Sequence, residues 1–262
     1  MKFKINCPCK NYECNDKNTN YNFVCNYEAY IELDNSDVVT LECENNNKKE
    51  IILYSAEFQI LFDLGVKAYI DDYYKEAVSD FASSLERFFE YFIFTIMLND
   101  GIEENEIEKF WKNICNQSER QLGAFYNLYL YKFREYIGLE KKIVEFRNKV
   151  IHKGYIPNKL ETMEYMKYIY YFIVNIINKM YCLYKRDEND FEKITEKLYK
   201  HIEYRIRRIK NKKQVRKIYK SSWVNIIDLE VFDDEAFSDE NINFENKFNN
   251  ILQNGFETAR GW

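Results

Sequence analysis

The stretch that decides the fold is AVSDFASSLERFFEYFIFTI, residues 77–96. Apolar side chains recur in it at three- and four-residue steps, which places them on one face of a helix. The residues that set this period are Ala77, Phe81, Leu85, Phe88, Phe92 and Ile96. The period begins upstream at Ala56, and Asn99-Asp100-Gly101 provides a helix stop. The sequence therefore predicts a long aromatic helix pair, with Asp71-Asp72 capping the second helix.

The composition favours a mainly helical chain with one sizeable core. Among 262 residues there are 23 Tyr and 20 Phe, but only 7 Gly and 2 Pro. So few turn-forming residues argue against an all-β fold. Further helices are predicted at about 103–115, 118–136, 139–153, 159–185 and 189–219. The breaks between them fall at Gly138, Gly154 and Pro157.

The first 54 residues differ from the rest in being rich in Asn and Cys. Short apolar runs at 27–33, 38–43 and 51–54 predict a small N-terminal antiparallel β domain. The cysteines of this region are Cys7, Cys9, Cys14, Cys25 and Cys43. Four thiolates suffice for a structural zinc, yet the Cys-x-Cys spacing departs from the knuckle of a zinc ribbon. A structural Zn site, a degenerate zinc ribbon and free thiols are all open readings, and Cys115 and Cys182 are expected in the core.

Three segments follow from these patterns: a Cys-rich β domain at 1–54, a helical domain at 55–220 and an acidic C-terminal tail at 221–262. The acidic part is Asp228–Glu245, and we expect the tail to be partly irregular. Met1–Ile5 leads into the cysteines without an apolar segment, so no signal peptide is predicted. No run reaches about 18 apolar residues, and the odd number of cysteines fits a reducing compartment. We expect a cytoplasmic protein with no membrane contact.

One polar run on a predicted helix carries the chemistry: Arg147-Asn148-Lys149-Val150-Ile151-His152. Its histidine is one of only 2 in the chain. Asn148 and His152 are four residues apart, so they share a helix face. Arg147 lies roughly 140° from His152 around an ideal helix, so the two converge poorly within one chain. Two copies facing each other across a two-fold axis would give a better site, which predicts a homodimer.

In its helices and in this run the chain resembles the HEPN superfamily (higher eukaryotes and prokaryotes nucleotide-binding). The resemblance covers roughly residues 56–185 and matches the family's Arg…His motif at Arg147, Asn148 and His152. It implies a HEPN-like helical bundle and a metal-independent endoribonuclease whose composite site forms in a dimer. It also implies a role in phage defence or as a toxin, with a protein antitoxin or sensor as a partner. Some toxin members have a Tyr two residues after the His, whereas Tyr155 is three residues after it.

RNA cleavage by 2′-hydroxyl attack suits these side chains. Protons must move, and a crowded, negatively charged phosphorane must be stabilised. His152 is suited to proton transfer near neutral pH, and Arg147 to holding the non-bridging oxygens. Asn148 can orient the imidazole or donate to the phosphate. These roles need no metal or other cofactor.

Three nearby charges have lesser expected roles. Glu86 is interpreted as a buried partner of an arginine rather than as a site residue. Glu145 is expected to face solvent. Lys153 favours the C-terminus of its helix and is a candidate RNA contact.

A second candidate surface is the segment Lys200–Lys220, in which Glu203 is the only acidic residue. Such a helix attracts a phosphate backbone, and the interleaved Tyr204 and Tyr219 can stack on bases. The predicted RNA-binding residues here are Arg205, Arg207, Arg208, Lys212 and Lys213. A solvated face, or an intramolecular partner for the acidic tail, explains the charge equally well. His201 is interpreted as an ordinary surface or core histidine.

Three functions compete on this sequence. The leading one is an endoribonuclease, as a defence or stress toxin. The second is a catalytically inactive helical module that binds RNA, nucleotide or a protein partner. The third is a regulator whose sheet domain senses a ligand while the helices dimerise.

Overall fold

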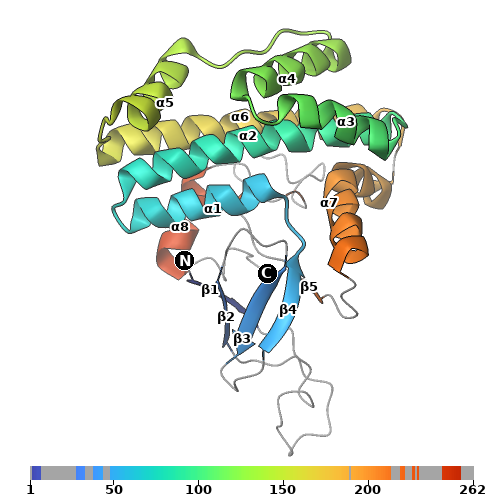
Figure 1. The fold of residues 1–262 in the computed structure, drawn as a ribbon. Coiled ribbons are helices and arrows are strands. Elements are labelled where there is room, and N and C mark those ends of the chain that lie inside the picture. The colour runs from blue at the N-terminus through green and yellow to red at the C-terminus, as the bar shows by residue number, and fades with distance from the viewer. Residues whose placement is uncertain are drawn as a thin grey trace, which may run out of the picture. The chain divides into compact units, whose positions relative to one another are not determined.

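The computed structural model of the chain describes residues 2–6, 28–32, 38–43, 48–188, 190–213, 219–221, 226–227, 229 and 244–254 (Figure 1). Over these residues the chain is mainly helical. The chain divides into two compact units. The helical unit comprises Ala56–His201 and Asn225–Asn249. The sheet unit comprises Met1–Ser55, Ile202–Val224 and Asn250–Trp262.

Helix α2 is the central element of the helical unit. It contacts α1, α3, α4, α5 and α6. In Figure 1, α5 and α4 cover different ends of α2. The first six helices are α1 Glu57–Ile70, α2 Tyr74–Asn99, α3 Glu104–Ile114, α4 Ser118–Phe133, α5 Lys141–Lys153 and α6 Lys159–Lys185. The predicted helices of this region are thus confirmed, and α4 ends early because Arg134 adopts a left-handed conformation with φ 58°.

The core of the helical unit is aromatic, as the period of residues 77–96 predicted. The rings of Phe58, Phe62, Phe81, Phe88 and Phe92 are all 0% exposed. Phe62 packs on Phe81 with ring centroids 5.0 Å apart, and Phe58 meets Phe88 edge to face at 5.3 Å. Burial of each such ring stabilises the fold by about 1.5–3 kcal/mol. These contacts join α1 to α2 and hold α2 in a fixed orientation.

Two residues shape the reversal between α1 and α2. A Cβ atom on Gly65 would lie 2.6 Å from the ring of Phe81, so only glycine permits this close approach. The prediction that Asp71-Asp72 caps α2 is wrong. Asp72 has φ 64° in the tight turn and accepts a hydrogen bond from the hydroxyl of Tyr74, while Tyr73 occupies the N-cap position. The reversal needs a left-handed residue, and aspartate tolerates that conformation better than most residues.

The sheet unit contains five strands in the order β1-β2-β3-β4-β5 within the described residues. The strands are β1 Lys2–Asn6, β2 Glu28–Glu32, β3 Val39–Cys43, β4 Lys48–Leu53 and β5 Tyr219–Ser221. The first four pair antiparallel in sequence order. The last strand pairs parallel to β4, with Ile51 opposite Tyr219. Neither β1 nor β5 belongs to the runs singled out in the sequence, although β1 alternates polar and apolar residues, and β5 is only 3 residues long.

Two further helices follow α6. Helix α7 spans Phe191–Lys213 and α8 spans Phe244–Asn254. In the predicted tail, Phe244 and Phe248 are buried, and their rings stack with centroids 5.4 Å apart. Phe248 also meets Tyr69 of α1 edge to face. The start of α8 is therefore part of the helical unit, while most of the acidic segment lies outside the described residues.

The prediction that Cys115 and Cys182 lie in the core is wrong. Cys182 is exposed and Cys115 is partly exposed. The Cys182 side chain turns to Asn178, with 3.4 Å between Sγ and Oδ1, because the buried face of α6 is filled by its larger neighbour Tyr181. Of the N-terminal cysteines, Cys7, Cys9, Cys14 and Cys25 lie outside the described residues, and Cys43 ends strand β3. None of the helices in the described part combines the length and apolar character that a membrane crossing requires.

Candidate functional site

Helix α5 presents the motif because two apolar residues anchor it. Ile143 and Val150 are buried and lie two turns apart, so one face of α5 is turned into the helical unit. The helix ends at Gly154, which has φ 69°. Arg147 and Asn148 are partly buried, and His152 is exposed in the last turn. The motif therefore begins at the edge of the core and ends at the surface.

The three motif side chains meet within one chain. Arg147 Nη1 donates to Asn148 Oδ1 at 3.1 Å and lies 3.1 Å from His152 Nε2. The expectation that Arg147 and His152 converge poorly on one helix is wrong, because the long arginine side chain spans the turn between them. Asn148 contacts the guanidinium, where either the imidazole or a phosphate was expected.

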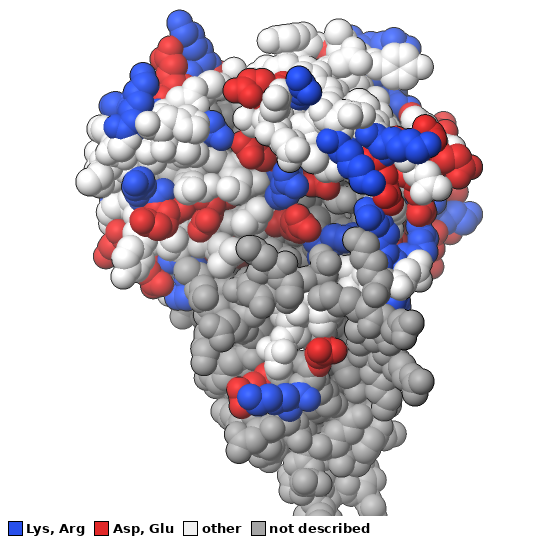
Figure 2. Space-filling model, in the orientation of Figure 1, with Lys and Arg blue, Asp and Glu red and all other residues white. Residues whose placement is uncertain are grey.

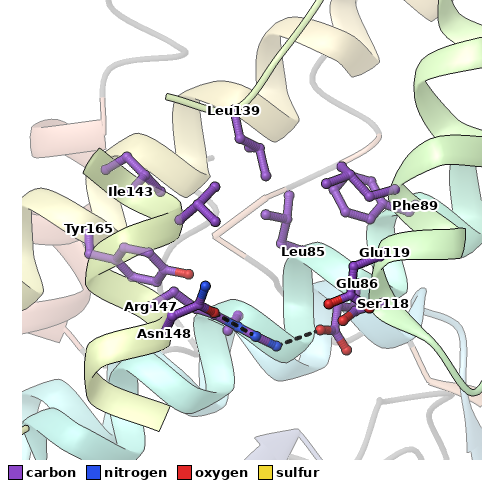
Figure 3. A pocket seen from close by; sticks show the side chains of 13 residues that line it. Leu85, Glu86, Phe89, Ser118, Glu119, Leu139, Ile143, Arg147, Asn148 and Tyr165 are labelled. Carbon is purple, nitrogen blue, oxygen red and sulfur yellow. Dashed lines mark hydrogen bonds and ion pairs between the residues drawn. The ribbon is translucent and has the colours of Figure 1, made fainter. Parts of the chain in front are cut away.

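The second helix of the core contributes the counter-charge. Glu86 Oε1 of α2 accepts from Arg147 Nη2 at 2.9 Å, and the two side chains are 29% and 24% exposed. Figure 3 shows both dashed contacts converging on the guanidinium from α5 and α2. The interpretation of Glu86 as a partner of an arginine is confirmed, but the side chain is partly exposed rather than buried. The pair fixes the position of the guanidinium, and its low exposure strengthens the attraction relative to a surface pair.

The contacts of Arg147 also define which atoms are left for a ligand. A guanidinium has five N–H groups, and three are used by Asn148, His152 and Glu86. One N–H on Nη2 and the N–H on Nε are left. Donors on Nε and Nη2 of a guanidinium can together bind a phosphate bidentately. Because a guanidinium only donates, a hydrogen bond between the two requires Nε2 of His152 as the acceptor.

A pocket of about 130 Å³ opens beside the motif (Figure 3). Its walls are mostly apolar, and its polar groups come from α2, the start of α4, α5 and α6. The lining residues are Ala82, Leu85, Glu86, Phe89, Ser118, Glu119, Leu122, Leu139, Ile143, Val144, Arg147, Asn148 and Tyr165. The exposed His152 is outside this lining, so the pocket continues the site on the side of Arg147.

Tyr165 brings a hydroxyl to the pocket from α6. Its side chain is 2% exposed, and Figure 3 shows the hydroxyl end directed toward Arg147 and Asn148. Burial raises the pKa of this phenol, and the positive charge of Arg147 opposes that shift. The hydroxyl is therefore protonated at neutral pH. Sequence reasoning did not single out Tyr165, because its helical spacing carries no sign of a polar role.

The other charges around the motif are placed away from it. Glu145 is exposed, as expected, and its carboxylate lies 3.6 Å from the ammonium of Lys141. Lys153 is exposed at the end of α5. Tyr155 donates to Glu161 at 2.7 Å, and the ammonium of Lys149 lies 3.6 Å from its ring centroid. Tyr155 is thereby held by Glu161 of α6 and by Lys149.

The basic segment of α7 belongs to the sheet unit from Ile202 onward. Arg207 is exposed, and Arg205 and Arg208 are partly exposed. Arg208 Nη1 donates to the hydroxyl of Tyr204 at 2.9 Å. Tyr204 is only 3% exposed, so the prediction that its ring stacks on bases is wrong: the helix turns it inward. The side chains of Lys212, Lys213 and Tyr219 lie outside the described residues.

His201 precedes this segment and packs on aromatic rings. Its ring centroid lies 4.9 Å from that of Phe94 and 6.1 Å from that of Tyr91. This agrees with its interpretation as an ordinary histidine. On the face shown in Figure 2, the basic and acidic side chains of the described residues are interspersed rather than gathered into a patch of one sign.

Within the described ranges, no group of three or more His, Cys, Asp or Glu is arranged to hold a metal ion. The N-terminal cysteines fall outside those ranges. Comparison of the chain with protein-family models, with curated proteins and with solved structures gives no match.

Proposed function

We propose that this chain is a HEPN-type endoribonuclease that cleaves RNA by 2′-hydroxyl attack without a metal ion. The observation that supports this is the contact between Arg147, Asn148 and His152, with the Arg147 side chain held by Glu86. A fixed cation beside an exposed imidazole provides the two things that the reaction requires.

The proposed reaction uses the atoms that the protein leaves open. A phosphate binds the Nε and Nη2 edge of Arg147, and an incoming 2′-hydroxyl replaces the guanidinium at Nε2 of His152. The imidazole takes the hydroxyl proton as the 2′-oxygen attacks phosphorus. The bond between phosphorus and the 5′-oxygen then breaks, which closes the 2′,3′-cyclic phosphate. The 5′-oxygen takes a proton from water to become a hydroxyl, and the imidazolium returns its proton to the solvent. Arg147 stabilises the charge on the non-bridging oxygens during this step.

The wider setting forms part of the same proposal. The helical unit is taken as a HEPN-like bundle, and residues 1–54 as a small β domain whose cysteines bind a structural Zn, belong to a degenerate zinc ribbon or are free thiols. The protein is proposed to act in the cytoplasm as an antiviral defence or toxin effector. A protein antitoxin or sensor is its proposed partner besides RNA.

A dimer is proposed on different grounds from those that the sequence offered. The motif residues meet in one chain, so the geometry of a single helix no longer requires a second copy. Two apolar side chains lie in the loop after α5 and at the start of α6: Ile156 is 78% exposed and Leu160 is 67% exposed. Light scattering should give about twice the chain mass of 32.0 kDa, and Ile156→Glu with Leu160→Glu should halve it. A wild-type protein that cleaves RNA as a strict monomer would refute the proposed dimer.

The direct test is incubation of purified protein with RNA in the presence of EDTA, followed by mapping of the cleaved ends. Ends with a cyclic phosphate and a 5′-hydroxyl are expected, and His152→Ala should lower the rate by about two orders of magnitude or more. Circular dichroism establishes that the variant is folded. Full activity in His152→Ala, or loss of activity in EDTA with the fold intact, would rule out this mechanism.

A second function is favoured by one specific observation. Three of the Arg147 N–H groups are already used within the protein, and its charge is balanced by Glu86. Such a cluster also suits a catalytically inactive module that binds RNA, nucleotide or a protein partner. RNA binding that is equal in wild type and His152→Ala, without cleavage in either, would favour this reading.

A further inference from the structure

We propose that the pocket beside Arg147 is a base-binding subsite that accepts a pyrimidine next to the scissile phosphate. This inference rests on the proposed function, because it names the RNA that the Arg147–His152 site would select.

The size of the pocket fits one six-membered ring. Its volume is about 130 Å³. A dry protein cavity of about 150 Å³ accepts benzene. A pyrimidine is of this size, whereas the second ring of a purine would have to remain outside. Apolar walls from Leu85, Phe89 and Ile143 suit the two faces of such a ring.

The polar groups of the pocket suit the edge of a pyrimidine. Asn148 uses its oxygen for Arg147, so its amide hydrogens are directed to other acceptors, such as a base carbonyl. Ser118 and Glu119, at the start of α4, bring a hydroxyl and a carboxylate. The carboxylate can accept from an exocyclic amino group or a ring N–H. Tyr165 adds a protonated hydroxyl from the opposite side.

The position of the pocket links base recognition to cleavage. Arg147 and Asn148 belong both to its lining and to the motif cluster. A base held in the pocket thus lies beside the phosphate that the free edge of Arg147 would bind. Binding energy from the base then helps to align the 2′-hydroxyl with His152, which raises the rate at a matching base.

The test compares short RNAs that differ only in one base next to a single cleavable linkage. Wild type should cleave beside a pyrimidine roughly tenfold or more faster than beside a purine. Leu122→Trp and Val144→Trp, each of which fills the pocket, should reduce kcat/KM at the pyrimidine to the level of the purine. Neither residue is part of the motif cluster. Leu130→Trp, on the exposed side of α4 and outside the lining, is the matched control and should keep the preference.

The outcomes separate the subsite from the proposed function. If wild type cleaves without base preference, or if both tryptophan variants keep the preference, the subsite is refuted and the ribonuclease stands. If wild type cleaves no RNA, the proposed function fails. Calorimetric titration with cytidine 3′-monophosphate and adenosine 3′-monophosphate then still tests whether the pocket binds a pyrimidine. The subsite is supported if the cytidine nucleotide binds saturably and at least several-fold more tightly than the adenosine nucleotide. This binding should be abolished in Val144→Trp but not in Leu130→Trp. Equal binding of the two nucleotides, or no binding, overturns it.

Discussion

Helices α5 and α7 both carry arginines, but they hold them in different ways. Arg147 of α5 is fixed by Glu86, Asn148 and His152, and its side chain is 24% exposed. Arg207 of α7 is exposed in a segment with many cations and one acid. The comparison shows that the number of cations on a helix and the fixed position of a single cation serve different functions. A cluster of exposed cations attracts RNA over a distance. A guanidinium in a fixed position can instead stabilise the charge that develops on a phosphate in the transition state.

The largest expected effect separates the two helices directly. Arg147→Ala should lower the cleavage rate by about two orders of magnitude or more, because it removes the proposed phosphate clamp. Arg207→Ala should change the rate by less than about threefold, since an exposed cation contributes little at one site. Single-turnover cleavage in EDTA measures both. Equal losses of cleavage rate in the two variants would show that Arg147 has no special role compared with Arg207.

The next effect tests whether the fixed position of Arg147 matters. Glu86→Gln keeps the shape of the side chain but removes the charge that holds the guanidinium. We expect kcat to fall roughly ten- to a hundredfold with KM little changed, because a misplaced group loses most of its catalytic value. Glu90→Gln is a matched control on the same helix, where the carboxylate pairs with Arg87 at 2.6 Å. If both variants lose activity alike, the effect comes from the stability of α2 rather than from Arg147.

A smaller and different effect is expected from α7. Reversal of Arg207, Arg208, Lys212 and Lys213 to Glu should weaken RNA binding and flatten its dependence on salt. The slope should change by up to about 0.7 for each phosphate of a single strand that the protein no longer neutralises. Cleavage of a dinucleotide, whose single phosphate is the one bound at Arg147, should be nearly unchanged. An unaltered salt slope would show that α7 is not the RNA surface.

The structure changes how the acidic tail should be tested as an inhibitor of that surface. Deletion of residues 228–262 would remove Phe244 and Phe248, which are buried in the helical unit, and would destabilise the protein. Substitution of Asp233, Asp234 and Glu235 by their amides removes charge and keeps α8. A tail that masks α7 predicts tighter RNA binding in this variant. Unchanged affinity would assign the basic segment another role.

The smallest expected effect is on stability and concerns Asp80 of α2, which lies near the like charge of Glu76. Burial raises the pKa of Asp80 to about 6, and Glu76 adds to the shift, whereas Glu86 faces an arginine. The folded-state pKa is above the ordinary value of 3.8, so folding favours the protonated form and stability falls as pH rises from about 4 to 6. Asp80→Asn should therefore raise Tm by a few degrees at pH 7.5 and by much less at pH 4. An equal gain at both pH values would exclude ionisation as the cause.

Much of the helical unit could be predicted from the sequence, because apolar residues recur at three- and four-residue steps along its long helices. Helix α6 was predicted at 159–185 and spans Lys159–Lys185, with Asn158 and Glu161 forming a reciprocal cap. Turns were harder, since the left-handed Asp72 follows from how α1 and α2 pack rather than from local propensity. Exposure of Cys182 likewise depends on which larger neighbours fill the core.

The candidate site was visible only in part. The motif at Arg147 and His152 is local, so its residue types and spacing could be read directly. The contact between them depends on a side-chain conformation, and helical geometry alone argued against it. Glu86 is far from Arg147 in the chain, and only tertiary packing brings it within 2.9 Å. The pocket needs four elements at once, which no single stretch of sequence encodes.

The parallel pairing of β4 with β5 has a consequence for the order of assembly. Ile51 pairs with Tyr219, and nearly the whole helical unit is encoded between them. During synthesis the first four strands leave the ribosome long before the fifth exists, so the edge of β4 stays unpaired until α7 has emerged. An open edge of this kind can pair with other chains. We therefore expect the last step of folding to be slow and prone to aggregation, and to be faster when the helical unit has already formed and brought the ends of the intervening chain together.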